Sequence, residues 1–130
     1  MTLKVFFDGG CRPNPGRIEV AVVARGQIRF FDDLGTGSSS DAEWLALYLA
    51  LGVAQASGEP HFDLVGDSRS VIEQASGAAV CRRPPAREHL ARYQALCAVA
   101  APLRVRWIPR QQNLAGIALA GRRNLARHSR

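Results

Sequence analysis

Three acidic residues lie where predicted secondary-structure elements begin or end. Asp8 closes a β-type run at residues 3–8, and Asp67 follows a second run at 61–66. Glu43 falls in the first turn of the helix that is predicted between them. If the two strands are neighbours, about 4.8 Å apart, the three carboxylates can share one cation. A ligand set made only of oxygen atoms favours a hard ion such as Mg²⁺ or Mn²⁺ over zinc.

Each acidic residue also has an ordinary structural explanation. Asp8 precedes two glycines, as a turn-forming aspartate would, and Asp67 could cap the helix that starts after it. Glu43 could complete a capping box with Ser40. Taken singly, these residues do not establish a metal site, and the elements that position them must decide between the two interpretations.

The hydrophobic pattern predicts three strands followed by alternating helices and strands. We expect strands at 3–8, 18–24, 27–32, 61–66 and 103–108, and helices at 40–53, 68–75, 85–100 and 113–120. This order implies an α/β fold with a mixed sheet, in which an antiparallel meander is continued by parallel strands with right-handed crossovers. Such a sheet would place the ends of the strands that carry Asp8 and Asp67 side by side.

The composition is that of a single globular domain. With 130 residues and 47% hydrophobic content, we expect one domain over 1–130, with a core of about 3–121 and a basic C-terminal tail at 122–130. No apolar run approaches the ~18 residues needed to span a bilayer, which predicts a cytoplasmic protein without a membrane partner. The three cysteines form no CxxC pair, as expected of reduced thiols.

The net charge of +6 is distributed unevenly along the chain. Residues 1–80 carry six Lys/Arg and ten Asp/Glu, a balance of −4, whereas residues 81–130 carry eleven and one, a balance of +10. The acidic part could hold metal ions while the basic part meets phosphate groups. A solvated, solubilising surface would produce the same asymmetry.

Four segments resemble the sequence motifs of type 1 ribonucleases H. Residues 8–16 read DGGCRPNPG, similar to the family's DGGxxxNPG, and residues 42–47 resemble its AExxAL helix. Residues 66–74 resemble the family's GDSxxVIxQ segment, and 107–113 resemble its WxPRxxN stretch. The four occur in the family's order and extend over nearly the whole chain. The sequence therefore resembles a minimal ribonuclease H domain without the basic protrusion of larger bacterial members.

The resemblance implies a ribonuclease H-like fold with a mixed five-stranded sheet. It also implies metal-dependent cleavage of the RNA strand of RNA/DNA hybrids, with two divalent ions and no protein nucleophile. In this scheme Asp8 bridges both ions, and Glu43 and Asp67 hold the ion that stabilises the leaving oxygen. No obligate protein partner is expected.

The resemblance further assigns a set of contacts to the nucleic acid. The residues carried over are Gly10, Cys11, Arg12, Asn14, Ser39, Ser40 and Gln74. Serines 38–40 stand where the family usually has Thr-Asn-Asn, and serine lacks the reach and the paired donor and acceptor of asparagine. Recognition of RNA 2′-hydroxyls is therefore expected to be weaker. Arg82 and Arg83 are expected to hold phosphate, although a solvated charged loop explains them equally well.

One position departs from the family in a way that concerns catalysis. The family's last motif reads NxxADxLA, and Ile117 stands where it has its fourth carboxylate. Because isoleucine cannot bind a metal ion, the first hypothesis is a ribonuclease H with reduced activity. The second is a catalytically silent nucleic-acid-binding module, and a third is a different nuclease on the same fold.

Overall fold

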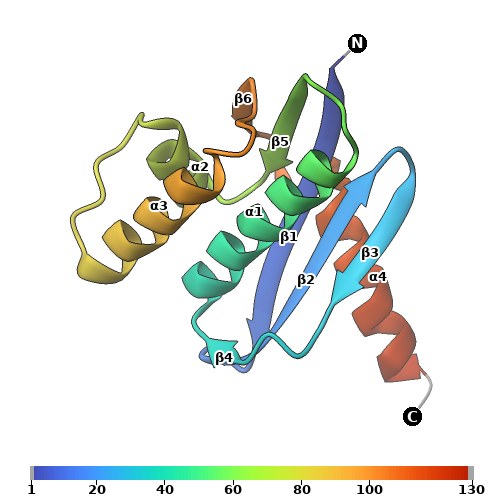
Figure 1. The fold of residues 1–130 in the computed structure, drawn as a ribbon. Coiled ribbons are helices and arrows are strands. Elements are labelled where there is room, and N and C mark those ends of the chain that lie inside the picture. Colours follow the sequence, from blue (N-terminus) through green and yellow to red (C-terminus); the bar gives the residue numbers. More distant parts are fainter. Residues whose placement is uncertain (1, 129–130) are drawn as a thin grey trace.

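The computed structural model describes residues 2–128, which form one mixed sheet with helices on both faces (Figure 1). The strands are β1 (Leu3–Arg12), β2 (Gly16–Ala24), β3 (Gln27–Phe31), β4 (Thr36–Gly37), β5 (Phe62–Gly66) and β6 (Arg104–Trp107). The helices are α1 (Ser39–Ala56), α2 (Arg69–Ser76), α3 (Pro84–Leu96) and α4 (Leu114–His128), with a 3₁₀ turn, η1 (Arg110–Gln112), before α4. No helix within residues 2–128 has the length and apolar character needed to cross a bilayer.

The strand order is β3-β2-β1-β5-β6. β1 pairs antiparallel with β2, and β2 with β3, whereas β5 pairs parallel with both β1 and β6. The predicted mixed sheet, with its antiparallel meander and two parallel additions, is therefore confirmed. β4 adds a sixth strand that pairs with β2 and was not predicted, because two residues are too few to show an alternating pattern.

Two apolar layers cover the sheet. The larger lies under α1, where Trp44 and Leu47 pack with Phe7 and Phe62 in the main buried cluster. The smaller lies on the opposite face, under α4 (Figure 1). α1 thus crosses one face of the sheet with its N-terminal turn near the middle of β1, which brings Glu43 within reach of Asp8. The first strand was predicted to end at Asp8, and that prediction is wrong, because β1 pairs with β2 as far as Arg12.

The start of α1 differs from the prediction by a change of cap. Ser38, not Ser40, is the N-cap residue: its Oγ accepts from the backbone N of Asp41 at 3.1 Å, and Asp41 Oδ2 accepts from Ser38 N at 3.0 Å. The expected capping box of Ser40 with Glu43 is wrong. Because Asp41 serves the cap, the carboxylate of Glu43 is free to make a long-range contact.

The last helix is longer than predicted and includes most of the residues that were expected to form a basic tail. α4 continues to His128 instead of ending at Ala120, and residues 129–130 lie outside the described residues. Arg122 bonds to Asp32 Oδ1 at 2.9 Å and Glu19 Oε1 at 3.1 Å, and Arg123 Nε donates to Glu19 Oε2 at 2.8 Å. These two arginines tie α4 to the sheet, so they are not part of a separate tail.

Candidate metal and nucleic-acid site

Asp8, Glu43 and Asp67 meet at one point in the structure. One oxygen atom from each carboxylate lies within 4.8 Å of the other two. The parallel pairing of β1 with β5 matches Phe6 to Val65, so Asp8 and Asp67 each follow two residues beyond that pair. α1 brings Glu43 in from one face. The predicted proximity of the three acidic residues is confirmed.

A backbone contact fixes Glu43 against β1. Gly9 N donates to Glu43 Oε1 at 2.6 Å, and the Glu43 side chain is buried. A Cβ at Gly9 would collide with the backbone oxygen of Ala42, so only glycine lets α1 approach β1 this closely. Gly9 lies inside β1, so this close packing, and not a turn, explains the glycine that follows Asp8 in the sequence motif.

Asp67 is held from two sides. Asn113 is fully buried, and its Nδ2 donates to Asp67 Oδ2 at 2.8 Å and to the carbonyl oxygen of Phe7 at 3.0 Å. Asn113 Oδ1 accepts from Ala115 N at 3.2 Å, which confirms its predicted role as the cap of the last helix. Trp107 Nε1 donates to the backbone oxygen of Asp67 at 3.1 Å. The segment between β6 and α4 thus orients the Asp67 carboxylate.

The electrostatics of the cluster favour a divalent cation. Burial raises the pKa of Asp8 to about 6 and the charge of Asp67 acts in the same direction, while a hydrogen bond with Glu43 and the charges of Arg110 and Arg123 oppose the shift. Burial and the charge of Asp8 hold the pKa of Glu43 well above its ordinary value. A hard cation would relieve this repulsion, and the all-oxygen donor set suits it. The three carboxylates are a cluster typical of a divalent-metal site.

These pKa shifts predict how the metal-free protein responds to pH. Because the folded-state pKa of Asp8 is about 6, above its ordinary value of 3.8, ionised Asp8 destabilises the fold, and stability is lost as pH rises through this range. We expect Asp8→Asn to raise the free energy of unfolding in EDTA near pH 7 by on the order of 2 kcal/mol, and the melting temperature with it. At pH 4 both quantities should change little. Thermal unfolding of both proteins from pH 4 to 7 measures the difference, and a difference independent of pH would contradict the prediction.

A shallow pocket of about 340 Å³ lies over the carboxylates. Its lining residues are Asp8, Gly9, Ser39, Ser40, Glu43, Asp67, Ser68, Ser70 and Arg110. Of the predicted nucleic-acid contacts, Ser39 and Ser40 line this pocket. The other predicted contacts, Gly10, Cys11, Arg12, Asn14, Gln74, Arg82 and Arg83, do not.

Asn14 and Ser39 form a pair next to the pocket. Asn14 Nδ2 donates to Ser39 Oγ, and Ser39 N donates to Asn14 Oδ1, both at 3.1 Å. Cys11 is buried, and its Sγ lies 3.6 Å from Asn14 Oδ1. The structure therefore gives Cys11 a place beneath the loop, where its thiol helps to hold Asn14.

The remaining predicted contacts lie outside the pocket lining. Gly10 lies under the guanidinium of Arg123, since a Cβ at Gly10 would be 2.9 Å from Arg123 Nη2. Arg12 is exposed. Gln74 Nε2 donates to Ser70 Oγ at 3.5 Å, which places its amide on the exposed side of α2. Arg82 and Arg83 are exposed just before and at the N-cap of α3.

Sequence reasoning missed Arg110 as a site residue. It belongs to η1, it lines the pocket, and its charge lowers the pKa of Asp8. The signal was present, because Arg110 is part of the WxPRxxN stretch, but that pattern does not show which side chain turns toward the carboxylates. Ser68 and Ser70 were missed for the same reason.

α4 approaches the cluster through Gly116. A Cβ at this position would lie 3.4 Å from Asp67 Oδ2 and 3.5 Å from Asp8 Oδ2, in ordinary van der Waals contact. Ile117 is 53% exposed and does not line the pocket. Gly116 is thus the residue of α4 that faces the carboxylates, whereas the side chain of Ile117 is largely in solvent and is not part of the pocket wall.

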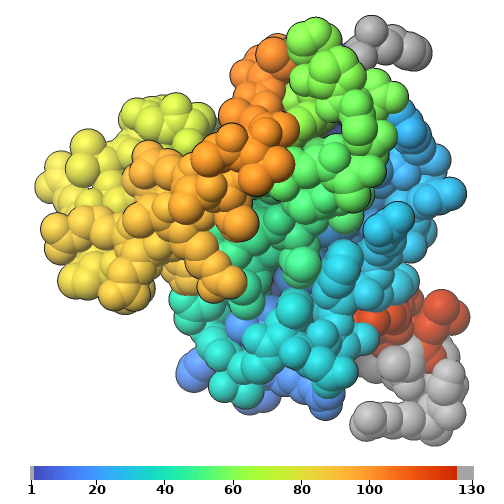
Figure 2. All heavy atoms as spheres, viewed as in Figure 1, coloured from blue at the N-terminus to red at the C-terminus, as the bar shows by residue number. Residues whose placement is uncertain are grey.

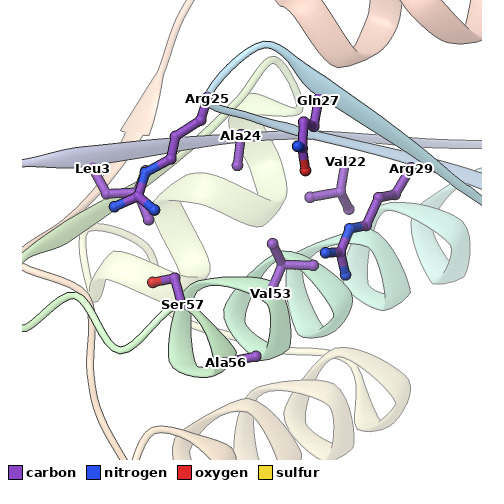
Figure 3. A pocket seen from close by; sticks show the side chains of 9 residues that line it. All are labelled: Leu3, Val22, Ala24, Arg25, Gln27, Arg29, Val53, Ala56 and Ser57. Carbon is purple, nitrogen blue, oxygen red and sulfur yellow. The ribbon is translucent and has the colours of Figure 1, made fainter.

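A second pocket, of about 250 Å³, lies at the other end of α1. In Figure 3 the side chains of Arg25 and Arg29 reach toward α1 on either side of an apolar floor that includes Val22 and Val53. Its lining contains no carboxylate, histidine or cysteine. This pocket therefore has no ligands for a metal ion, and the carboxylate pocket is the candidate site.

The fold and the cluster together define a class of protein: an α/β domain whose central strands and first helix converge on three carboxylates that could hold a metal ion. A family model described as "Reverse transcriptase-like" matches residues 6–123. The chain belongs to this family, and its domain is ribonuclease H-like.

Three comparisons with known proteins agree with this assignment. The chain is 32% identical over 127 residues to Ribonuclease HI of Halobacterium salinarum, a match that covers 91% of this chain and 62% of that protein. It is similar to the crystal structure of RNase H1 from the same archaeon, with 30% identity, a TM-score of 0.77, and coverage of 93% and 99% of the two chains. LC11-RNase H1, crystallised with an RNA/DNA hybrid, is 23% identical, with a TM-score of 0.73 and coverage of 87% and 89%.

Proposed function

We propose that this chain is a metal-dependent endonuclease that cleaves the RNA strand of RNA/DNA hybrids. The observation that carries the proposal is the convergence of Asp8, Glu43 and Asp67 within 4.8 Å. The likeness to Ribonuclease HI of Halobacterium salinarum supports the same activity, although this chain spans only 62% of that relative's length. A binding protein has no evident need to keep mutually repelling carboxylates together.

The proposed roles of the side chains follow from their positions. Asp8 interacts with both of the other carboxylates and would bind both ions, while Glu43 and Asp67 would bind the ion near the leaving oxygen. When bound, Mg²⁺ or Mn²⁺ would supply Lewis-acid stabilisation of the phosphodiester and activation of water. Arg110, on the pocket wall, would neutralise a phosphate oxygen.

The side of the pocket formed by the start of α1 is the proposed place of the RNA strand. The hydroxyls of Ser39 and Ser40 lie there, next to the amide of Asn14. Hydroxyl and amide groups can donate to and accept from a 2′-hydroxyl, which is the group that distinguishes RNA from DNA. The Asn14 and Ser39 side chains already bond to each other, so RNA binding would have to exchange that bond.

One assay tests this proposal directly. Purified protein is incubated with end-labelled RNA/DNA hybrid, duplex RNA and duplex DNA, each with Mg²⁺ or Mn²⁺, and the products are separated by size. We expect cuts in the RNA strand of the hybrid and none in duplex DNA. Equal cutting of all three duplexes would assign a different nuclease activity.

The second candidate function is a silent nucleic-acid-binding module, and Ile117 is the observation that favours it. The family's fourth carboxylate is replaced there, and nothing in the pocket lining offers another acidic side chain in its place. Binding of the hybrid without cleavage in either metal would support the module.

The salt dependence of binding tests the arginines at the start of α3. Phosphate contacts release counterions, so the affinity for the hybrid should fall steeply with salt. If Arg82 and Arg83 each contact a phosphate, replacing both with Ala should reduce the slope of log K against log salt concentration by about one to two. Binding titrations at several salt concentrations measure this slope, and an unchanged slope would assign both side chains to solvent.

A further inference from the structure

α3 is attached to the rest of the protein along a narrow stripe. Tyr93 is its only buried residue, and Ala86, His89 and Leu90 are partly buried on the same side. Figure 1 places α3 and the α2–α3 loop beside α1, and Figure 2 shows this region, in yellow to gold, as a lobe that projects from the body. Tyr93 joins the main core, and Gln55 Nε2 of α1 donates to Leu96 O at 2.9 Å at the C-terminal end of α3. The orientation of the N-terminal half of α3 is left to other polar contacts.

The exposed end of α3 is strongly basic. Arg82, Arg83 and Arg87 are all exposed there, and none of the three forms an ion pair within the described part of the chain. Arg122 and Arg123 of α4, in contrast, are already paired with acidic side chains. The α3 arginines are thus available to phosphate, provided that α3 is held at a suitable angle.

His89 connects α3 to α1 through both ring nitrogens and its backbone oxygen. Its Nε2 donates to Asp41 Oδ1 at 2.9 Å. The hydroxyl of Tyr48 lies 2.8 Å from His89 Nδ1 and 2.8 Å from the backbone oxygen of His89. The imidazole also stacks on Trp44, with ring centroids 5.6 Å apart and an interplanar angle of 9°. The His89 side chain is accordingly only 21% exposed.

These contacts reach the residues that form the carboxylate pocket. Asp41 uses one carboxylate oxygen for His89 and the other for Ser38 N at the cap of α1. Ser39, which pairs with Asn14, is the first residue of α1. His89 therefore links α3 to the part of α1 that faces the proposed RNA strand.

We propose that His89 is a positioning residue that fixes the α3 arginines relative to the carboxylate pocket, so that a hybrid bound at the pocket also meets their guanidinium groups. This inference rests on the proposed function, because it concerns binding of the same duplex. It assigns His89 no contact with substrate or metal. His89 affects hybrid binding only by setting the angle of α3.

The main test is a comparison of binding slopes. Fluorescence anisotropy with a labelled RNA/DNA hybrid is recorded in EDTA at several salt concentrations, so that no cleavage occurs. The variants are His89→Phe, the double variant Arg82→Ala/Arg83→Ala, the triple combination, and His61→Ala as a matched control at an exposed histidine. His89→Phe keeps an aromatic ring over Trp44 and removes both hydrogen-bonding nitrogens.

We expect His89→Phe to weaken hybrid binding by about 3- to 10-fold and to reduce the salt slope by about one, as the loss of one phosphate contact would. In the Arg82→Ala/Arg83→Ala background the same change should add much less, because Arg87 alone remains of the three arginines that His89 positions. Mg²⁺ affinity measured by calorimetry should equal that of the wild type. Cleavage, where present, should show a higher KM with kcat nearly unchanged.

Several outcomes would overturn the inference. An unchanged slope in a folded His89→Phe, or a full additive loss in the triple variant, would leave His89 with a purely structural role. Should circular dichroism show that His89→Phe is unfolded, Tyr48→Phe removes only the hydroxyl at Nδ1 and must then show the same change in slope. A wild-type protein that binds no hybrid would overturn the proposed function together with this inference, whereas intact wild-type binding with unaffected variants would overturn the inference alone.

Discussion

Asp67→Asn is expected to abolish cleavage of the RNA/DNA hybrid while the protein stays folded and binds the duplex. The substitution keeps the shape of the side chain but removes a charge from the cluster. Divalent-metal catalysis is worth several kcal/mol of transition-state stabilisation, so loss of one of three carboxylates should lower the rate by about 10³-fold or more. Initial rates on labelled hybrid with Mg²⁺ measure the effect.

The hydrogen bond from Asn113 can be kept in the Asp67→Asn variant, so the test isolates the loss of charge. Asn113 Nδ2 donates to Asp67 Oδ2 at 2.8 Å, and the amide introduced by Asp67→Asn can still accept there through its oxygen atom. Ser68 is a suitable control position, because Ser68→Ala alters the pocket wall without removing a carboxylate. Cleavage by Asp67→Asn at the wild-type rate would point to a contaminating nuclease or to another active site.

The closeness of Asp8 and Asp67 could be predicted from the sequence, although β1 continues to Arg12, so Asp8 lies inside this strand and not at its predicted end. Each residue follows a short apolar run, and the element order restricts the sheet to a topology in which the two runs are neighbours. The structure confirms this with parallel pairing between β1 and β5. The end of β1 and the depth of burial, which raises the pKa of Asp8, depend on tertiary structure and could not be predicted from the local sequence.

The cap of α1 shows where local patterns are ambiguous. Residues 38–43 read SSSDAE, so both Ser38 with Asp41 and Ser40 with Glu43 satisfy the spacing of a capping box. The choice is made by tertiary structure. Glu43 is drawn to Gly9 N of β1, which leaves Asp41 to cap the helix.

Contacts between residues far apart in the sequence could not be predicted from local sequence patterns. His89 is 48 residues from Asp41, and nothing in the composition of α3 distinguishes it from a solvent-facing histidine. Arg110 reaches the pocket because η1 follows the strand next to β5, which no periodicity shows. The contacts of both residues depend on how the helices pack on the sheet, which the local sequence does not show.

Ile117→Asp is expected to raise Mg²⁺-dependent cleavage by about 10²-fold or more. Position 117 follows Gly116, where a Cβ would lie 3.4 Å from Asp67 Oδ2 and 3.5 Å from Asp8 Oδ2, so the backbone of α4 is close to the carboxylates at this point. The wild-type side chain is 53% exposed, which gives an aspartate room to turn toward the site. If a missing protein ligand costs a few kcal/mol of transition-state stabilisation, supplying it restores that amount.

Metal dependence distinguishes a new ligand from an indirect effect. The wild-type protein, which lacks a fourth carboxylate, should require high Mg²⁺ or favour Mn²⁺, because Mg²⁺ demands stricter octahedral geometry. Ile117→Asp should lower the Mg²⁺ concentration needed for half-maximal activity, and calorimetry should detect tighter ion binding. Ile117→Asn, of the same size but without charge, is the matched control and should resemble the wild type. A folded Ile117→Asp that binds hybrid but cleaves no faster than the wild type would contradict this prediction. If the wild type already cleaves quickly, another group fills the role of the fourth carboxylate. If neither metal supports cleavage, the chain is a binding module.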